Sequence, residues 1–147
     1  MSVIILDTNV VSEPLQLRPD PRVAAWARAV ADRRLCTTAI TLGELAYGLA
    51  KLPLGHRRDG LRTAIDAAIA TLGPDGVLPY DRAAAALVGD ILVARERMGR
   101  PIQRADAQIA AICRHAGASL ATRNTADFDG LGLDLINPWL WSSPGGS

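Results

Sequence analysis

The chain has few residues of the kinds that build zinc sites or disulfide frameworks. Its 147 residues include two cysteines, Cys36 and Cys113, and two histidines, His56 and His115. The cysteines lie in separate apolar segments without a CxxC pair, and the histidines have no metal-ligand spacing with each other or with a cysteine. We therefore expect two buried free thiols, two surface histidines and no zinc site.

A strong charge imbalance and long apolar stretches are also missing. The net charge is +1, so a nucleic acid could be bound only where basic residues are concentrated locally. The apolar stretches are broken by charged residues well short of a membrane span, and the first is short, with no Lys or Arg before it. We therefore expect a cytoplasmic protein with neither a signal peptide nor a membrane segment. No Ser-His-Asp or Cys-His set indicates a nucleophilic side chain.

What is present is the pattern of one α/β domain. Hydrophobic residues make up 49% of the chain and charged residues 21%, which is typical of a globular protein. Short β-branched runs predict strands at residues 3–6, 35–38, 77–80, 119–122 and 133–136. Helical periodicity predicts helices at residues 21–30, 41–50, 61–72, 82–98 and 103–115. Strands separated by helices predict a parallel sheet covered on both faces, in a domain spanning residues 1–141 with a flexible polar tail at 142–147.

Acidic residues interrupt apolar runs that are far apart in the sequence. Asp7 directly follows the first predicted strand, and Asp127 lies in the loop after the fourth. In open α/β sheets the site lies outside the carboxyl ends of the strands, so these two acids are expected near one another. Glu44 and Asp106 come from two predicted helices. Carboxylates that converge repel one another unless cations hold them, which makes a metal site the leading interpretation.

Each acid also has a purely structural interpretation. Asp7 could cap the following helix. Glu44 falls opposite the apolar face of its helix, where a solvated glutamate is ordinary. Asp106 borders the apolar face of its helix, and an unpaired carboxylate there is costly, so it could instead pair with Arg104 or Arg123. Asp127 could cap a turn before Phe128.

The fourth position of the site is open between Asn124 and Asp127, which lie in one loop. Oxygen ligands alone favour Mg²⁺ or Mn²⁺ over zinc. Such a metal lowers the pKa of a bound water and neutralises charge on a phosphate, so the matching reaction is hydrolysis of a phosphodiester. The arginines near these acids could steer a phosphate backbone or form an ordinary solvated face; they are Arg95, Arg97, Arg100, Arg104, Arg114 and Arg123.

Four segments together resemble the PIN domain, and most closely the VapC and FitB type of prokaryotic toxin. They are residues 3–9 (VIILDTN), 41–45 (TLGEL), 106–111 (DAQIAA) and 122–128 (TRNTADF). The resemblance covers nearly the whole chain and implies a three-layer α/β/α sandwich that cleaves RNA with Mg²⁺ or Mn²⁺ as the toxin of a toxin–antitoxin pair. It also implies a homodimer and a cognate antitoxin that covers the active site.

On the matching positions, the resemblance implies that Asp7, Glu44 and Asp106 are metal ligands. The family's fourth acid corresponds to Asn124, so the chain departs from an all-acid set unless Asp127 substitutes as a ligand. Catalytic roles are thus expected at Asp7, Glu44, Asp106, Asn124 and Asp127, with Thr8 and Thr122 positioning ligands or a water.

Two other functions compete with the ribonuclease interpretation. A non-catalytic PIN-like module that binds a protein or RNA partner is favoured by Asn124 and by the near-neutral charge. A phosphatase of the haloacid dehalogenase type also begins with a strand that ends in Asp. That family places a second Asp two residues later, where this chain has Asn9.

Overall fold

The molecule is built around a five-stranded parallel sheet with the strand order β3-β2-β1-β4-β5. The structure is a computed structural model and describes residues 2–145, so the end of the predicted tail at 146–147 lies outside it. All five predicted strands are present, several of them shorter than predicted. Their bounds are β1 Val3–Leu6, β2 Arg34–Thr38, β3 Val77–Leu78, β4 Ser119–Ala121 and β5 Leu135–Ile136.

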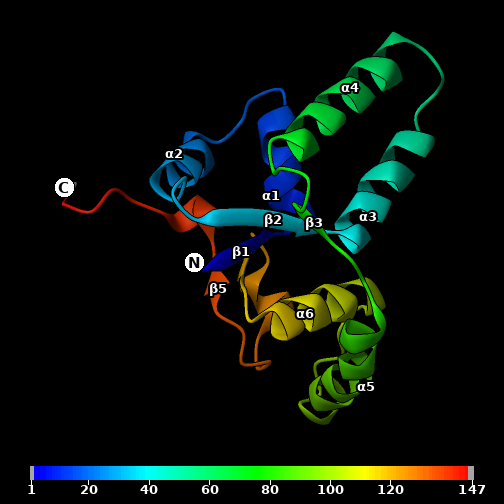
Figure 1. Ribbon diagram of the computed structural model, residues 1–147, viewed down its shortest axis with the longest axis vertical. Coiled ribbons are helices and arrows are strands. Elements are labelled where there is room, and N and C mark those ends of the chain that lie inside the picture. The colour runs from blue at the N-terminus through cyan, green and yellow to red at the C-terminus, as the bar shows by residue number, and fades with distance from the viewer. Residues whose placement is uncertain (1, 146–147) are drawn as a thin grey trace.

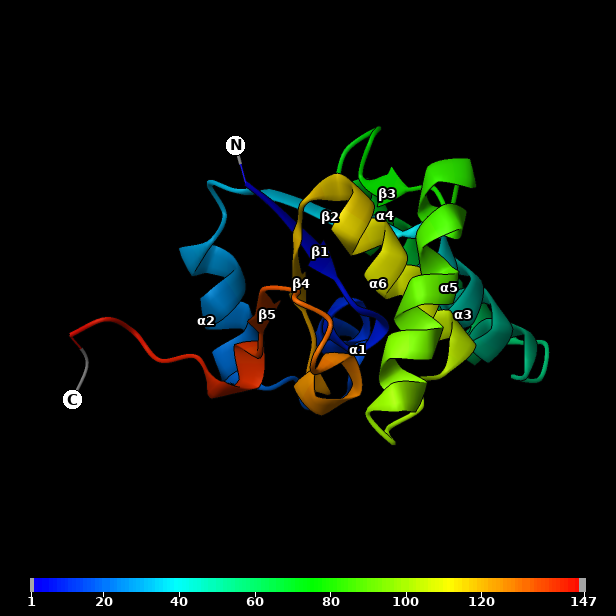
Figure 2. The same ribbon diagram turned by 90° about the horizontal axis from the view of Figure 1, so that it is seen from below.

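Helices cover both faces of this sheet, as Figures 1 and 2 show. The α-helices are α1 Thr8–Ser12, α2 Pro21–Ala29, α3 Ala39–Ala50, α4 His56–Ala70, α5 Arg82–Arg97 and α6 Arg104–Ala116. Short 3-10 helices follow at η1 Glu13–Leu15, η2 Thr125–Phe128 and η3 Pro138–Leu140. The predicted parallel sheet between helical layers is therefore confirmed.

Local capping explains where several helices begin and end. The side chains of Asp7, Thr38 and Asp81 accept hydrogen bonds from the first backbone N–H groups of α1, α3 and α5. Gly117 ends α6 in the left-handed conformation. The helix α4 begins at His56, earlier than predicted, because its first turn is polar and so gives no apolar periodicity.

The two faces of the sheet bury separate cores, because successive side chains of a strand point to opposite faces. Ile5 of β1 packs with α5 and α6, whereas Ile4 packs with Val10 of α1 and with Val23 and Trp26 of α2. Figure 2 shows α5 and α6 side by side on their face of the sheet. These two cores hold the carboxyl ends of β1 and β4 in place.

The helix α6 is the most deeply buried helix element described. Ala107 and the run from Ile109 to Cys113 are at most 2% exposed. Cys36 and Cys113 are buried free thiols, as predicted. Burial raises the pKa of Cys113 to about 12, so this thiol stays protonated and unreactive. No helix within residues 2–145 has the length and hydrophobicity that a bilayer span requires.

Candidate active site

The site begins at Asp7, where β1 ends and α1 starts. Asp7 is only 6% exposed, and its backbone N–H donates to the carbonyl of Ala121 on the neighbouring β4 at 2.9 Å. Its Oδ1 accepts the N–H of Thr8 at 2.8 Å, and its Oδ2 accepts the hydroxyl of Thr122 at 2.7 Å. Asp7 therefore caps a helix and also faces the site, so the two interpretations from the sequence are compatible.

Two threonines beside Asp7, Thr8 and Thr122, form hydrogen bonds to the other elements of the site. The Thr8 hydroxyl donates to Oε1 of Glu44 on α3 at 2.8 Å. Thr122 is fully buried, and its Oγ1 accepts the backbone N–H of Asn124 at 3.1 Å. The position of Thr8 and Thr122 beside the acids agrees with the positioning role that the resemblance implies.

All five predicted catalytic residues line one cavity of about 350 Å³ at the carboxyl edge of the sheet. The cavity is lined by Asp7, Thr8, Asn9, Ser12, Glu44, Asp106, Asn124, Asp127 and Phe128. Four of these side chains are carboxylates and none is basic. The structure therefore brings together Asp106 from α6, Glu44 from α3 and the loop after β4, which the sequence separates widely.

Asn9 and Ser12 were not predicted as site residues. Ser12 donates to the carbonyl of Thr8, one helical turn earlier, at 2.9 Å. The side chain of Asn9 accepts the backbone N–H of Arg123 at 3.1 Å. The spacing from Thr8 to Ser12 on α1 was the available signal, because residues four apart share one face of a helix.

The carboxylates perturb one another. Burial raises the pKa of Asp106 to about 6, and the negative charges of Asp7, Asp127 and Glu44 add to that effect, while Arg95 opposes it. Burial also raises the pKa of Asp7, against the hydrogen bonds from Thr122 and Thr8. The cavity thus holds excess negative charge that a cation would relieve.

The structural interpretation of Asp106 is wrong. Within residues 2–145 the ion pairs are Arg22–Asp20 and Arg100–Asp129, so neither Arg104 nor Arg123 pairs with Asp106. Asp106 lies in the first turn of α6, and its burial is not explained by a basic partner in the described chain.

The donor atoms of the cavity match a hard divalent cation. Carboxylate oxygens are the ligands that Mg²⁺ and Mn²⁺ prefer, and the side chains of Asp7, Glu44, Asp106 and Asp127 supply them. In the described part of the chain, no group of three or more His, Cys, Asp or Glu side chains is arranged so that it could hold a metal ion as it stands. The fit is therefore one of chemistry and charge, and a metal at this cavity remains a prediction.

Three of the arginines that were considered for steering a phosphate donate hydrogen bonds to backbone carbonyls of the protein, and one of them, Arg95, is buried. Arg95 is 4% exposed, and its guanidinium donates to the backbone carbonyls of Arg100, at 2.8 Å, and Asp127. Arg114 donates to the carbonyl of Leu131 at 2.6 Å. Arg100 forms an ion pair with Asp129 at 3.1 Å and donates to the carbonyl of Ala126 at 3.2 Å. These side chains tie the η2 region to the helices.

Arg95 is expected to be a major contributor to stability. Replacing it with Ala would remove a buried side chain and leave the carbonyls of Arg100 and Asp127 without this donor, so we expect Arg95→Ala to lower the free energy of unfolding by about 2–4 kcal/mol. Urea denaturation measures this loss. The matched control is Arg97→Ala, an exposed position on the same helix, which should cost less than about 1 kcal/mol. Equal losses would show that the Arg95 contacts contribute little.

The fold and the cavity define an α/β domain with an acidic site at the carboxyl edge of a parallel sheet, the edge at which such folds bind their ligands. The family model described as PIN domain matches residues 4–132. The chain belongs to the PIN domain family. The haloacid dehalogenase interpretation is therefore excluded, and the three-layer α/β/α fold is confirmed.

Curated relatives match over most of their length. The chain is 39% identical over 137 residues to VapC ribonuclease Y4jK of Sinorhizobium fredii, covering 93% of this chain and 98% of that protein. It is 35% identical to toxin FitB of Neisseria gonorrhoeae over 93% of this chain and 99% of FitB. It is 30% identical to the tRNA(fMet)-specific endonuclease VapC of Shigella flexneri, covering 95% and 99%.

A solved structure has the same fold. The structure of FitAB bound to an IR36 DNA fragment aligns with a TM-score of 0.86 and 34% identity, covering 95% of this chain and 98% of that chain. The crystal structure of FitAcB from Neisseria gonorrhoeae aligns with a TM-score of 0.85 and 35% identity, covering 94% and 99%.

Proposed function

We propose that this chain is an endoribonuclease that depends on Mg²⁺ or Mn²⁺ and acts as the toxin of a toxin–antitoxin pair. The PIN domain and the ribonuclease and toxin relatives support a toxin with ribonuclease activity. The observation that carries the metal dependence is the convergence of four carboxylates in one cavity without a basic side chain in its lining.

Asp7, Glu44, Asp106 and Asp127 would hold the cation. A divalent cation bound there supplies charge neutralisation for the phosphate and lowers the pKa of a water molecule, so that the water can attack phosphorus. Asn124 would contact this ligand set or the substrate through its amide. No covalent intermediate with the protein is needed, because a metal-bound water can be the nucleophile and the lining includes no His or Lys that would activate the hydroxyl of Thr8 or Ser12.

The residues of the chain prepare this site before any ligand binds. Thr8 and Thr122 fix both carboxylate oxygens of Asp7, and Thr8 also holds Glu44. Such contacts set the orientation of potential ligands and are costly to lose. Without a cation, Asp106 keeps its proton up to about pH 6, and a cation would compete with that proton.

The proposed partners are a cognate antitoxin and a second copy of this chain. The solved FitAB and FitAcB complexes support the antitoxin, and we extend it to this chain by its likeness to FitB. The homodimer and the cytoplasmic location rest on the family resemblance. The sequence offers three tryptophans and the Ala-rich start of α5 as candidates for the dimer interface. Trp26 and Trp139 are buried in the core, which leaves Trp141 and α5.

The test is an assay of the purified chain, free of antitoxin, on single-stranded RNA. We expect cleavage with Mg²⁺ or Mn²⁺, no cleavage in EDTA, and recovery when Mn²⁺ is added back. Single-stranded DNA of the same sequence serves as the comparison substrate. Cleavage that continues at full rate in EDTA would overturn the metal-dependent mechanism.

The alternative is a PIN-like module that binds RNA or protein without catalysis, and Asn124 in place of an acid is the observation in its favour. Calorimetric titration with Mn²⁺ separates the two functions. The ribonuclease should bind the metal, and the module should bind none at millimolar concentrations. RNA binding without cleavage or metal uptake would establish the module.

A further inference from the structure

A second cavity lies beside the acidic one, and its lining includes two arginines and one glutamate. It has a volume of about 570 Å³ and is lined by Asn9, Ser12, Glu13, Gln16, Leu17, Arg18, Arg123 and Trp139. Asn9 and Ser12 line both cavities, so the two are direct neighbours. An RNA strand bound in the acidic cavity could therefore continue along the surface into this second cavity.

Arg123 is held firmly at the wall of this second cavity. Its backbone N–H donates to Oδ1 of Asn9 at 3.1 Å, and its carbonyl accepts the side-chain amide of Asn137 at 3.4 Å. Its guanidinium lies over the indole ring of Trp139, 5.1 Å from the centroid. Stacking on one face leaves the N–H groups at the edge of the guanidinium available to an anion.

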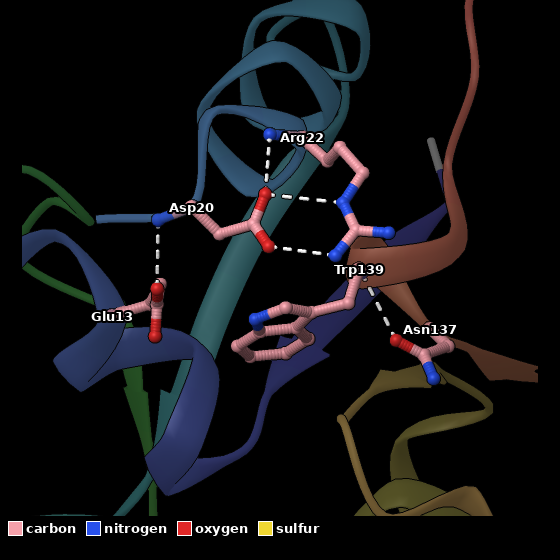
Figure 3. Close-up of polar contacts among 5 residues, drawn as sticks. All are labelled: Glu13, Asp20, Arg22, Asn137 and Trp139. Carbon is pink, nitrogen blue, oxygen red and sulfur yellow. Dashed lines mark hydrogen bonds and ion pairs between the residues drawn. The ribbon is translucent and has the colours of Figure 1, made fainter. Parts of the chain in front are cut away.

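The platform beneath Arg123 is part of the core. Trp139 is 4% exposed and packs with Trp26 and Ile4. Its backbone N–H donates to Oδ1 of Asn137 at 3.0 Å, which fixes the start of η3 (Figure 3). A guanidinium placed on a buried ring loses little conformational freedom when it binds a ligand.

The acids around this cavity are already engaged. Asp20 forms an ion pair with Arg22 at 2.8 Å, and the Oε1 of Glu13 accepts the backbone N–H of Asp20 at 2.8 Å (Figure 3). The hydrogen bonds from Arg22 lower the pKa of Asp20 to about 2, and the charge of the nearby Arg123 adds a smaller effect in the same direction. Among residues 2–145, Arg18 and Arg123 belong to no ion pair.

We propose that Arg123, with Arg18, binds the backbone phosphate of the RNA strand adjacent to the phosphate in the acidic cavity. This proposal rests on the proposed ribonuclease function and adds a substrate-binding subsite to it. A guanidinium matches a phosphate in charge and in its two-pronged geometry. The adjacent acidic cavity repels phosphates unless it holds a cation, so an anchor next to it would position the strand.

A phosphate anchor has recognisable consequences. It carries no sequence information, so its loss weakens binding of all RNA sequences alike. Each phosphate contact to a single strand adds about 0.7 to the slope of log affinity against log salt concentration. Charge-assisted hydrogen bonds of this kind correspond to about a 10- to 100-fold change in affinity.

The test uses Arg123→Gln, with Arg33→Gln as the control, because Arg33 is exposed and precedes β2 at the opposite edge of the sheet. We expect Arg123→Gln to raise KM for a fluorescent oligoribonucleotide about 10-fold, with kcat little changed. Arg123→Lys retains the charge and should recover part of the loss. Thermal denaturation confirms that each variant is folded.

Neutralising single phosphates of the RNA locates the contact. A methylphosphonate at one linkage beside the cleavage site should weaken wild-type binding and add nothing to Arg123→Gln. If the methylphosphonate and Arg123→Gln lower the affinity additively at every linkage, the proposal is overturned. Unchanged RNA binding together with weaker retention of the co-expressed antitoxin would also overturn it and assign the cavity to the protein partner.

The same variants separate this proposal from the proposed function. RNA binding is measured by fluorescence anisotropy in EDTA, where no metal-dependent cleavage occurs. Weaker binding by Arg123→Gln in EDTA supports the subsite even for a chain that never cleaves RNA. Cleavage by the wild type with equal KM for Arg123→Gln and Arg33→Gln overturns the subsite and leaves the ribonuclease in place.

Discussion

Asp106→Asn is expected to lower the rate of RNA cleavage by about 10²–10³-fold while making the metal-free protein more stable. The loss of activity follows because the variant keeps the shape of the side chain but removes one of the four charges that would hold a cation. The gain in stability follows because Asp106 is half-buried and lies among Asp7, Asp127 and Glu44. A variant that simply destabilised the fold would lower both the cleavage rate and the stability, whereas we expect the rate to fall and the stability to rise.

The stability effect has a defined dependence on pH. The pKa of Asp106 rises from 3.8 to about 6 on folding, so the folded state binds this proton more tightly than the unfolded chain. The folded state is therefore relatively favoured below about pH 4, and it loses this advantage as the pH rises from 3.8 to about 6. Above that range the ionised carboxyl costs ~1–2 kcal/mol, after allowance for its partial exposure to solvent.

Urea denaturation in EDTA at a series of pH values measures this contribution. The wild type should lose free energy of unfolding between pH 4 and 6 relative to Asp106→Asn, whose side chain does not titrate. Asp90→Asn is the control, because Asp90 is exposed on α5 and outside the cavity. Full cleavage by Asp106→Asn would remove the proposed metal site. A parallel pH profile would show that the carboxylates do not repel in solution.

The second large effect is expected at Asp127, which we assign to the fourth position of the site. The Asp127 charge raises the pKa of both Asp7 and Asp106, so its carboxylate faces the same space. We expect Asp127→Asn to lower kcat/KM and the affinity for Mn²⁺ by about 10- to 100-fold. Its backbone contact to Arg95 is retained in this variant, so the fold should be unchanged.

Asn124→Ala is the matched comparison for Asp127→Asn. Asn124 also lines the cavity, but its contact with Thr122 is made through the backbone N–H and survives the substitution. We therefore expect a smaller loss of activity than for Asp127→Asn, with Mn²⁺ affinity retained. A larger loss at Asn124 than at Asp127 would transfer the fourth position to the amide. Calorimetric titration and steady-state kinetics measure the two effects.

The convergence of the acids could be predicted from the sequence because it depends on topology. Asp7 and the loop after β4 follow strands of one parallel sheet, and such strands present their carboxyl ends at the same edge. Asp106 could be placed because helical periodicity put it at the border of an apolar face. Glu44 was the weakest prediction, since only the hydrogen bond from Thr8 shows why it turns toward the site.

What could not be predicted depends on contacts with backbone carbonyls. The partners of Arg95 are the carbonyls of Arg100 and Asp127, and a sequence does not show which carbonyls a fold leaves without donors. Arg95 has charged neighbours on a long helix, so the sequence predicted an exposed side chain there. The stacking of Arg123 on Trp139 could not be predicted either, because it depends on where the fold places η3 relative to the loop after β4.

The burial of α6 limits how far Asp106, an acid of the proposed site, can move. The central part of this helix packs between the sheet and α5, so we expect its amide protons to exchange only when the whole domain unfolds. Asp106 lies in the first turn of α6, where the backbone N–H groups have no acceptor within the helix, so its own amide proton should exchange sooner, although the buried helix anchors its main chain. Asp127, by contrast, sits on a short 3-10 helix fastened by arginine side chains. Both carboxylates of the proposed site are therefore held by the protein, Asp106 through the apolar packing of its helix and Asp127 through hydrogen bonds from arginines to the backbone of its segment. We expect their positions to change little when a substrate binds.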